Sequence, residues 1–298
     1  MTVTRNNVDV MSARKSTLGS DHPDTLRSMA NLACTYRDQG RWNEAEKLDV
    51  DVMNARKSKL GSDHPDTLRS MANLACTYRD QGRWDEAEKL DVYVMSARKI
   101  KIGLDHPDTL TSMANLSCTY KSQGRLSEAE KLDVAVMNAR KTKLGLDHPD
   151  TLRSMANLAW TYRNLGRLDE AEKLDVDVMN ARKTQLGLDH PDTLCSMANL
   201  AWTYRNLGRL DEAEKLDVNV MNARKTKLGL DHPDTLHSMA YLACTYWYQG
   251  KLDEGYSLLS LAIQAMQQIM GTSHPTVLHY IEQLNIFSEA KQQKERQH

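Results

Sequence analysis

The sequence has almost no net charge and no long apolar run. Its 39 lysine and arginine residues are balanced by 40 aspartate and glutamate residues, which leaves a formal charge of −1. A chain with this balance has no general attraction to nucleic acid or to an anionic membrane. The first residues contain no apolar stretch typical of a signal peptide, and the most apolar stretch, 258–266, is too short to span a bilayer. We therefore expect a cytoplasmic protein with neither nucleic acid nor a membrane among its partners.

Proline is also scarce, and each of the seven prolines follows a histidine. These His-Pro pairs recur every 42 residues, and the segments 148–189 and 190–231 differ at only three positions. A fixed period of this size indicates an array of one supersecondary unit. We expect residues 1–298 to form a single all-α solenoid. Its parts are a partial repeat in 1–21 that holds only a second helix, six full repeats in 22–273, and a C-terminal helix with a polar tail in 274–298.

Each repeat is predicted to be a helical hairpin. Pro23 suits the first position of helix A, where its missing N–H is no loss, and Gly40 supplies a left-handed end. Helix B then follows at once, where Asn43 and Glu46 have the spacing of a capping box. Gly61 ends helix B, and the same pattern repeats along the array. Because the chain opens inside such a hairpin, we expect it to be a piece of a longer protein.

Residues that could carry chemistry do not converge. The five cysteines are an odd number, and those at equivalent repeat positions are at least one helix spacing apart, about 8–10 Å, beyond the ~7 Å Cα separation of a disulfide. Histidines one repeat apart cannot reach the ~2 Å bonds of one zinc ion. The glycines stand at helix ends rather than in a phosphate-binding loop. We therefore expect free thiols, no metal, no cofactor and no enzymatic activity.

The repeat resembles a known family. Leu32, Ala33, Tyr36, Gly40 and Ala45 match the signature spacing of tetratricopeptide repeats (TPR). The 42-residue length and the HPDTL, NLA-x-x-Y and EAE-x-L segments resemble kinesin light chains, and even more the arrays of fungal and bacterial nucleotide-binding signalling receptors. This resemblance implies a right-handed superhelical solenoid of antiparallel helix pairs, with helix A lining the concave side. One departure is an aspartate in helix B where the family usually carries an aromatic residue.

Much of the difference between repeats falls on the face of helix A opposite the core, so we expect it to bind a partner. Asparagines in register can bond to an extended peptide backbone, tryptophans are typical of binding hot spots, and arginines favour acidic groups. The predicted partner-binding residues are Arg69, Asn73, Asn115, Arg153, Asn157, Trp160, Arg163, Asn199, Trp202 and Arg205. The chain is thus expected to be a protein–protein interaction scaffold that binds an acidic or aromatic-containing protein or peptide in the concave groove, and to be the sensing part of a larger protein.

Three alternatives stay open. Trp160 and Trp202 could serve only to fill gaps between adjacent helices, because amphipathic helices bury most of their tryptophan. The array could be structural or self-associating through its ends, where the segments 8–14 and 277–287 carry unpartnered apolar residues. Other helical-hairpin repeats bind single-stranded RNA, although the neutral charge argues against that use here.

The aspartates of helix B lie at the edge of its buried face, where a carboxylate needs hydrogen-bond partners. Serine and threonine recur seven residues apart on helix A. In the last repeat the aspartate becomes Leu259, and the following serine and threonine become Tyr280 and Phe287. Because polar and apolar residues change together, we predict that each aspartate contacts a serine or threonine of the next repeat, such as Asp49 with Ser70 or Thr77.

Overall fold

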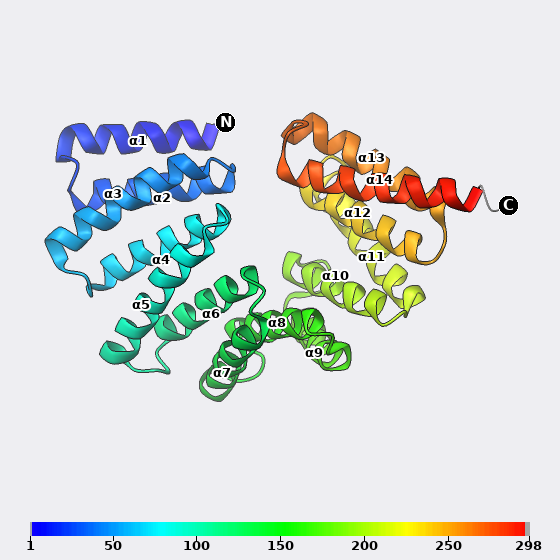
Figure 1. Cartoon of the computed structure of the whole chain (residues 1–298), viewed down its shortest axis with the longest axis horizontal. Helices are drawn as coiled ribbons and strands as arrows, with labels where there is room; N and C mark the ends of the chain where they lie inside the picture. Colours follow the sequence, from blue (N-terminus) through cyan, green and yellow to red (C-terminus); the bar gives the residue numbers. More distant parts are fainter. Residues whose placement is uncertain (1, 296–298) are drawn as a thin grey trace. The chain divides into compact units, whose positions relative to one another are not determined.

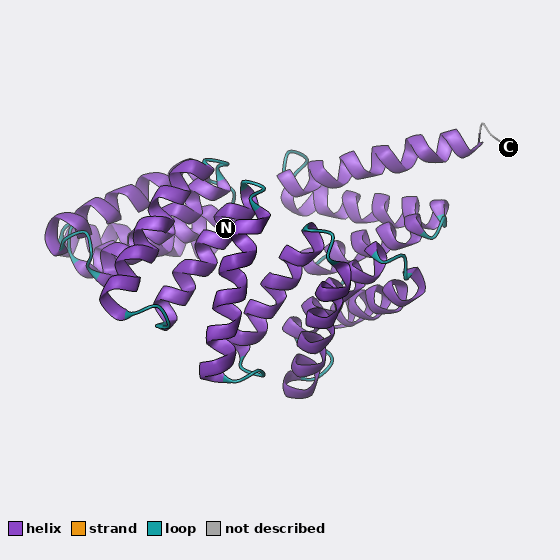
Figure 2. Cartoon of the chain, turned by 60° about the horizontal axis from the view of Figure 1, so that its bottom comes forward, coloured by secondary structure: helices purple, strands orange, loops and turns teal. Residues whose placement is uncertain are grey.

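A computed structural model describes residues 2–295, with side chains described for 6–289. All the regular structure in that span is α-helical, as predicted, and short loops join consecutive helices (Figures 1 and 2). The chain falls into two compact units, unit 1 (1–146) and unit 2 (147–298). Within each unit every helix packs against the next along the chain. None of the helices between residues 2 and 295 is both long and apolar enough to cross a membrane.

Unit 1 begins with the predicted lone second helix and continues with three hairpins. Its helices are α1 (Thr2–Leu18), α2 (Pro23–Asp38), α3 (Trp42–Leu60), α4 (Pro65–Asp80), α5 (Trp84–Ile102), α6 (Pro107–Ser122) and α7 (Leu126–Leu144).

Unit 2 holds three further hairpins and a final helix. Its helices are α8 (Pro149–Asn164), α9 (Leu168–Leu186), α10 (Pro191–Asn206), α11 (Leu210–Leu228), α12 (Pro233–Tyr248), α13 (Leu252–Met270) and α14 (Pro275–Glu295). Helix α14 runs beyond the predicted end near Ala290. The segment expected to be a polar tail contains lysine, glutamine and glutamate, which favour helix, and no glycine or proline to stop it.

The His-Pro pair makes two contributions to the start of each first helix. His148 is extended, with φ −68° and ψ 138°, and Pro149 takes the first helical position, as predicted. In addition, His148 Nδ1 accepts a hydrogen bond from the backbone N–H of Asp150 at 3.1 Å. The histidine is therefore an N-cap, and it satisfies one of the amides that a helix start leaves without an intrahelical partner. Within the described residues, no group of three or more His, Cys, Asp or Glu is placed to hold a metal ion.

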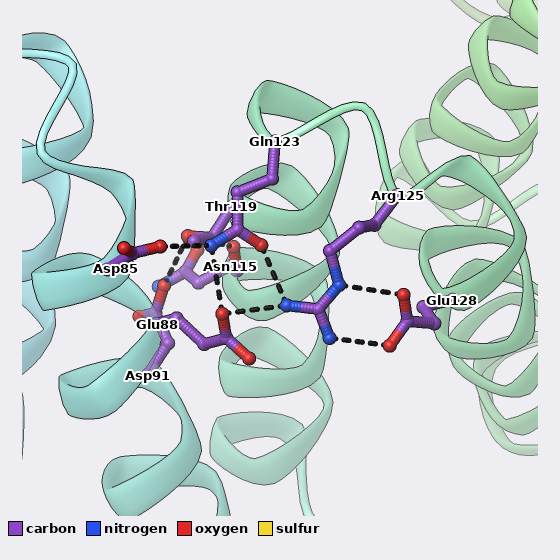
Figure 3. A network of polar contacts seen from close by, with 8 residues as sticks. All are labelled: Asp85, Glu88, Asp91, Asn115, Thr119, Gln123, Arg125 and Glu128. Carbon is purple, nitrogen blue, oxygen red and sulfur yellow. Dashed lines mark hydrogen bonds and ion pairs between the residues drawn. The ribbon is translucent and has the colours of Figure 1, made fainter.

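The predicted capping box of the second helices is wrong. The N-cap position belongs to the arginine before the helix, such as Arg125, whose side chain makes no capping bond. Asp85 and Glu88 lie inside the helix and face the next repeat, where Gln123 donates to both, at 3.3 and 2.8 Å (Figure 3). Arg125 donates to Glu88 at 2.7 Å. The box residues therefore join neighbouring hairpins; Asn43 and Glu46 do the same for the preceding pair, where both accept from Gln81.

The core of each hairpin is small and repeats along the chain. In α10 and α11 it consists of Leu194, Met197 and Val220, each at most 4% exposed. Ala213 is fully buried, which lets the paired helices approach closely. Because each of these clusters joins only adjacent helices, stability is a sum of hairpin and neighbour interactions.

A polar layer joins successive repeats, as predicted, and threonine is the partner of aspartate in it. Thr77 donates to Asp49 at 2.7 Å, and the same bond recurs at later seams. Equivalent pairs are Asp91 with Thr119, Asp175 with Thr203, and Asp217 with Thr245. At the first seam Asn7 replaces the aspartate and donates to Thr35 at 2.9 Å. Asp133 is held within its own hairpin, by Ser117 at 2.7 Å and Lys121 at 2.8 Å.

The serine half of that prediction is wrong. Ser70 accepts a hydrogen bond from Arg56 at 2.8 Å, and the serines of later first helices have the same kind of partner. Arg56 lies on the preceding second helix, seven residues or about two turns after Asp49.

At the last seam every polar partner is replaced by an apolar one. Leu259, Phe287 and Tyr280 are buried in one hydrophobic cluster, as predicted. Met266 stands at the repeat position of the serine-binding arginine and belongs to the same cluster. Trp247 stacks on the Phe287 ring, with 4.0 Å between the ring centroids. Between α13 and α14 these positions therefore make apolar contacts, which explains why the substitutions occur together, while the Tyr280 hydroxyl bonds to His237 of α12.

Candidate functional site

Much of the difference between repeats lies on the first helices of the hairpins. In unit 2 these are α8, α10 and α12, and α14 continues the series. The varying side chains occupy equivalent turns, because each first helix begins 42 residues after the previous first helix. On α8 and α10 they include Trp160 and Trp202, and on α12 they include His237, Tyr241 and Tyr248.

Both tryptophans are partly exposed, as predicted. Trp160 is 39% exposed, and Trp202 is half-buried. The guanidinium of Arg163 lies 5.0 Å from the centroid of the Trp202 ring, a distance at which a cation attracts the face of an indole. The indoles therefore do more than fill gaps between helices: each presents apolar surface to solvent, and Trp202 is held in place by a charged neighbour.

Two adjoining cavities lie along this surface, and together we call them the aromatic groove. The smaller, of about 190 Å³, is lined by Trp160, Arg163, Ala198, Asn199, Trp202, Arg205 and Tyr241. The larger, of about 720 Å³, is lined by Trp202, Arg205, Asn206, His237, Tyr241, Cys244, Tyr248, Thr276, His279, Tyr280 and Gln283. Trp202, Arg205 and Tyr241 line both, so the groove is continuous over α8, α10, α12 and α14.

The larger cavity is lined by aromatic and polar side chains. Tyr248 is 65% exposed and Tyr241 is 40% exposed. His237 Nδ1 and the Tyr280 hydroxyl are 2.9 Å apart and share a hydrogen bond. Burial lowers the pKa of His237 and raises the pKa of Tyr280, so both groups favour their neutral forms near neutral pH. The cavity can therefore offer hydrogen bonds without adding charge.

The asparagines of the groove are held in two different ways. Asn206 Nδ2 donates to the Trp202 carbonyl oxygen at 2.7 Å, and Asn164 donates to the Trp160 carbonyl oxygen at 2.8 Å. Those amide groups are tied to their own helices, and of the two residues only Asn206 lines the groove. Asn199 is half-buried and lines the smaller cavity beside Trp202.

Arg163 and Arg205 differ from the prediction. Both were expected to flank the stripe and attract acidic groups of a partner. Their side chains are only 4% and 6% exposed, and each is paired with an aspartate of its own hairpin. Arg163 donates to Asp175 at 2.6 Å, and Arg205 donates to Asp217 at 3.1 Å. The guanidinium groups line the groove, but their charge is already compensated.

The other predicted residues are distributed over both units. Arg69 and Arg153 are exposed at the starts of their helices, where each pairs with the aspartate three residues earlier. Asn73, Asn115 and Asn157 are half-buried on α4, α6 and α8. None of these five residues lines the aromatic groove. The structure therefore brings together Trp160, Arg163, Asn199, Trp202 and Arg205 from the predicted set.

Several lining residues were not among those predicted to bind a partner. His237, Tyr241 and Tyr248 occupy the same stripe positions as the predicted residues. His279 and Gln283 continue it on α14, exactly one period after His237 and Tyr241. The available signal was the 42-residue spacing, which places α14 beside α12. The prediction relied on asparagine and tryptophan, and the last repeat carries neither residue type at these positions.

The tetratricopeptide repeat family matches six consecutive segments of this chain, residues 25–66, 67–108, 109–150, 151–192, 193–234 and 235–276. No curated protein matches the sequence. A crystal structure of nearly identical TPR-like repeats from a putative kinesin light chain of Podosopora anserina is 31% identical, with a TM-score of 0.59. That match covers 70% of this chain and 98% of the other.

Two more distant structures share the fold. One is a signal transduction ATPase with numerous domains and a tetratricopeptide repeat sensor, from Pyrococcus horikoshii (14% identity, TM-score 0.62, 90% of this chain and 39% of that one). The other is NprR in complex with its cognate peptide NprX (15% identity, TM-score 0.60, 93% of this chain and 79% of that one). The predicted resemblance to kinesin-light-chain-like arrays and to signalling-receptor arrays is confirmed.

Proposed function

This chain belongs to the tetratricopeptide repeat family, and we propose that it is a protein–protein interaction scaffold that binds a peptide segment along the aromatic groove. The observation that carries the proposal is the continuity of that groove over four successive first helices. A peptide laid across it would meet side chains from equivalent positions of each helix, since the lining positions recur with the repeat. We further propose that the array is the partner-binding part of a larger protein; the Pyrococcus horikoshii ATPase likewise carries a tetratricopeptide repeat sensor beside other domains.

The chemistry of the groove supports a peptide as ligand. Large aromatic surfaces such as Trp160 and Tyr248 contribute binding energy with little loss of side-chain entropy, and they are enriched at binding hot spots. Asn199 and Gln283 can donate to and accept from a peptide backbone. The two cavities, at about 190 and 720 Å³, have room for side chains of a bound segment. NprR, which has the same fold, was solved with a bound peptide.

The proposal is tested by selection from a phage-displayed library of short random peptides against the purified chain. Affinities of the selected peptides are then measured for Trp160→Ala and Asn199→Ala. We expect each substitution to weaken binding at least about tenfold, the loss typical of a hot-spot residue. A library that yields no binder, or binders that both variants hold as tightly as the unaltered chain, would contradict the proposal.

Matched controls exist outside the groove. Trp84, at the start of α5, is 42% exposed, close to the 39% of Trp160. Asn222, on the second helix α11, is exposed away from the lining residues of the groove. Trp84→Ala and Asn222→Ala remove the same chemical groups from other surfaces. Both controls are expected to bind the selected peptides as the unaltered chain does.

A further inference from the structure

We propose that Asp175 and Asp217 make the aromatic groove electrically neutral, so that it accepts peptide segments with aromatic and uncharged polar side chains and discriminates against acidic ones. The inference rests on the proposed function and adds to it the class of ligand. It assigns to two buried aspartates, which touch no ligand, the role of specificity-determining residues.

The groove is lined by two arginines that could attract acidic peptides. Among its described lining side chains, Arg163 and Arg205 alone carry a permanent charge. Arg205 lines both cavities, and Arg163 lies against the face of Trp202. Two cationic groups in a partly desolvated groove would ordinarily favour carboxylates strongly, because screening by water is weak there.

The two aspartates cancel that attraction. Each carboxylate lies behind its arginine, is 2% exposed, and is absent from the lining of the groove. Arg205 is further committed, since it donates to Thr245 at 2.8 Å and to the Tyr241 carbonyl oxygen at 3.2 Å. A ligand carboxylate could capture the arginine only by leaving a buried aspartate without its counter-ion, and uncompensated buried charges are strongly unfavourable.

What remains available to a ligand is aromatic and neutral. Tyr241, Tyr248 and Trp160 are the exposed large side chains of the groove. Burial lowers the pKa of His237 and so favours its neutral ring, which shares a hydrogen bond with the Tyr280 hydroxyl. The Gln283 amide hydrogen-bonds His279 at 3.3 Å at the far end of the larger cavity. These groups suit aromatic rings, hydroxyls and amides of a peptide.

The test repeats the library selection with the double variant Asp175→Asn/Asp217→Asn. Asparagine keeps the size of the side chain and removes its charge, so the arginines become uncompensated. We expect the unaltered chain to select aromatic, uncharged peptides and the double variant to select peptides enriched in aspartate and glutamate. An acidic peptide should bind the double variant at least about tenfold more tightly than it binds the unaltered chain.

The control is Asp177→Asn. Asp177 is an exposed residue of the same helix as Asp175, and Asn219 naturally occupies the equivalent position one repeat later. This variant removes one negative charge without touching the polar layer, and we expect its selected peptides to match those of the unaltered chain. If it also selects acidic peptides, net charge rather than masking of the arginines sets the preference, and the inference is wrong.

A second measurement needs no variant. Binding of the selected peptides to the unaltered chain should change less than about twofold when the salt concentration rises roughly tenfold, since salt screens only interactions between net charges. Acidic peptides selected by the unaltered chain, with a steep loss of affinity in salt, would overturn the inference but leave the proposed function standing. No selected peptide at all would overturn both.

Discussion

Thr245 donates a hydrogen bond to Asp217 across 2.6 Å, although 28 residues separate them. The bond joins the second helix of one hairpin to the first helix of the next. The threonine in turn accepts from Arg205 at 2.8 Å, so three residues from three consecutive helices form one buried group. The same group recurs with Arg163, Asp175 and Thr203 in the preceding hairpin.

We expect Thr245→Val to reduce the free energy of unfolding by about 1–3 kcal/mol, because valine keeps the shape but deprives a buried carboxylate of a donor. The measurement is urea unfolding followed by circular dichroism. Thr226→Val is the control, since Thr226 is exposed and bonds only within its own helix, to the Asn222 carbonyl oxygen. Its effect should stay within about 0.5 kcal/mol. Equal losses for the two variants would show that the seam bond adds nothing.

The pH dependence of stability should reveal the buried aspartate. Burial raises the pKa of Asp217 in the folded chain, and Arg205 and Thr245 only partly oppose this. In the unfolded chain the pKa returns to about 3.9. As the pH falls from the folded pKa toward the unfolded pKa, the folded state binds the proton first, so the free energy of unfolding rises. Asp217→Asn has no carboxyl group at this position, and its stability should not show this rise.

Urea unfolding of the two proteins at several pH values between about 7 and 4 measures this difference. A change in the opposite direction would mean that the attraction of Arg205 outweighs burial and that the folded pKa lies below the unfolded one. Surface pairs such as Arg209 with Glu212 are present in both proteins, so their titration cancels in the comparison.

The sixth repeat has a glycine, Gly255, where the preceding repeat has Ala213. A methyl group added at Gly255 would lie 2.9 Å from the Ala243 carbonyl oxygen and 3.3 Å from the Trp247 amide nitrogen, both backbone atoms. We expect Gly255→Ala to lower the free energy of unfolding by about 1 kcal/mol or more, since overpacking outweighs the helix propensity of alanine.

The reciprocal substitution Ala213→Gly should also destabilise, because it removes a buried methyl group and adds backbone freedom. The pair is compared by urea unfolding. A stabilised Gly255→Ala would show that α12 and α13 can separate at little cost.

His190 Nδ1 accepts a hydrogen bond from the Asp192 amide at 3.2 Å and caps α10. Substitutions of His190 should therefore destabilise the chain by an amount that depends on whether the new side chain keeps an acceptor. His190→Ala removes the acceptor and should reduce the free energy of unfolding by about 0.5–1 kcal/mol, whereas His190→Asp, which keeps an acceptor, should lose much less. Thermal unfolding distinguishes the two. If both variants lose the same amount, the histidine acts through its extended backbone rather than through its ring.

The sequence was sufficient for the fold because its information is periodic. Glycine and His-Pro at fixed intervals mark both ends of each helix, and the joint replacement of Asp217 and Thr245 by Leu259 and Phe287 identified residues in contact. Such covariation within one chain reports a pair without any need to know the geometry that brings it together.

The charge and the extent of the candidate site could not be predicted from the periodicity of the sequence. A projection of one helix places Arg205 on the flank of the stripe, but it cannot show that Asp217, twelve residues later on another helix, turns back to meet it. The width of the larger cavity depends on how far α14 stands from α12, which is set by the packing of Trp247 on Phe287. The start of the second helix was also predicted wrongly, because Arg41 rather than Asn43 occupies the N-cap.

The Asp–Thr seam between α9 and α10 is repeated between α11 and α12, and this has a consequence for how such genes change. Loss of residues 190–231 by unequal recombination would place α9 directly before α12. Asp175 would then face Thr245 in place of Thr203, and Arg163 would reach the same hydroxyl that Arg205 reaches now. Since these polar seam partners would be chemically equivalent to those they replace, the number of repeats can drift between copies of the gene without a penalty in the buried polar layer.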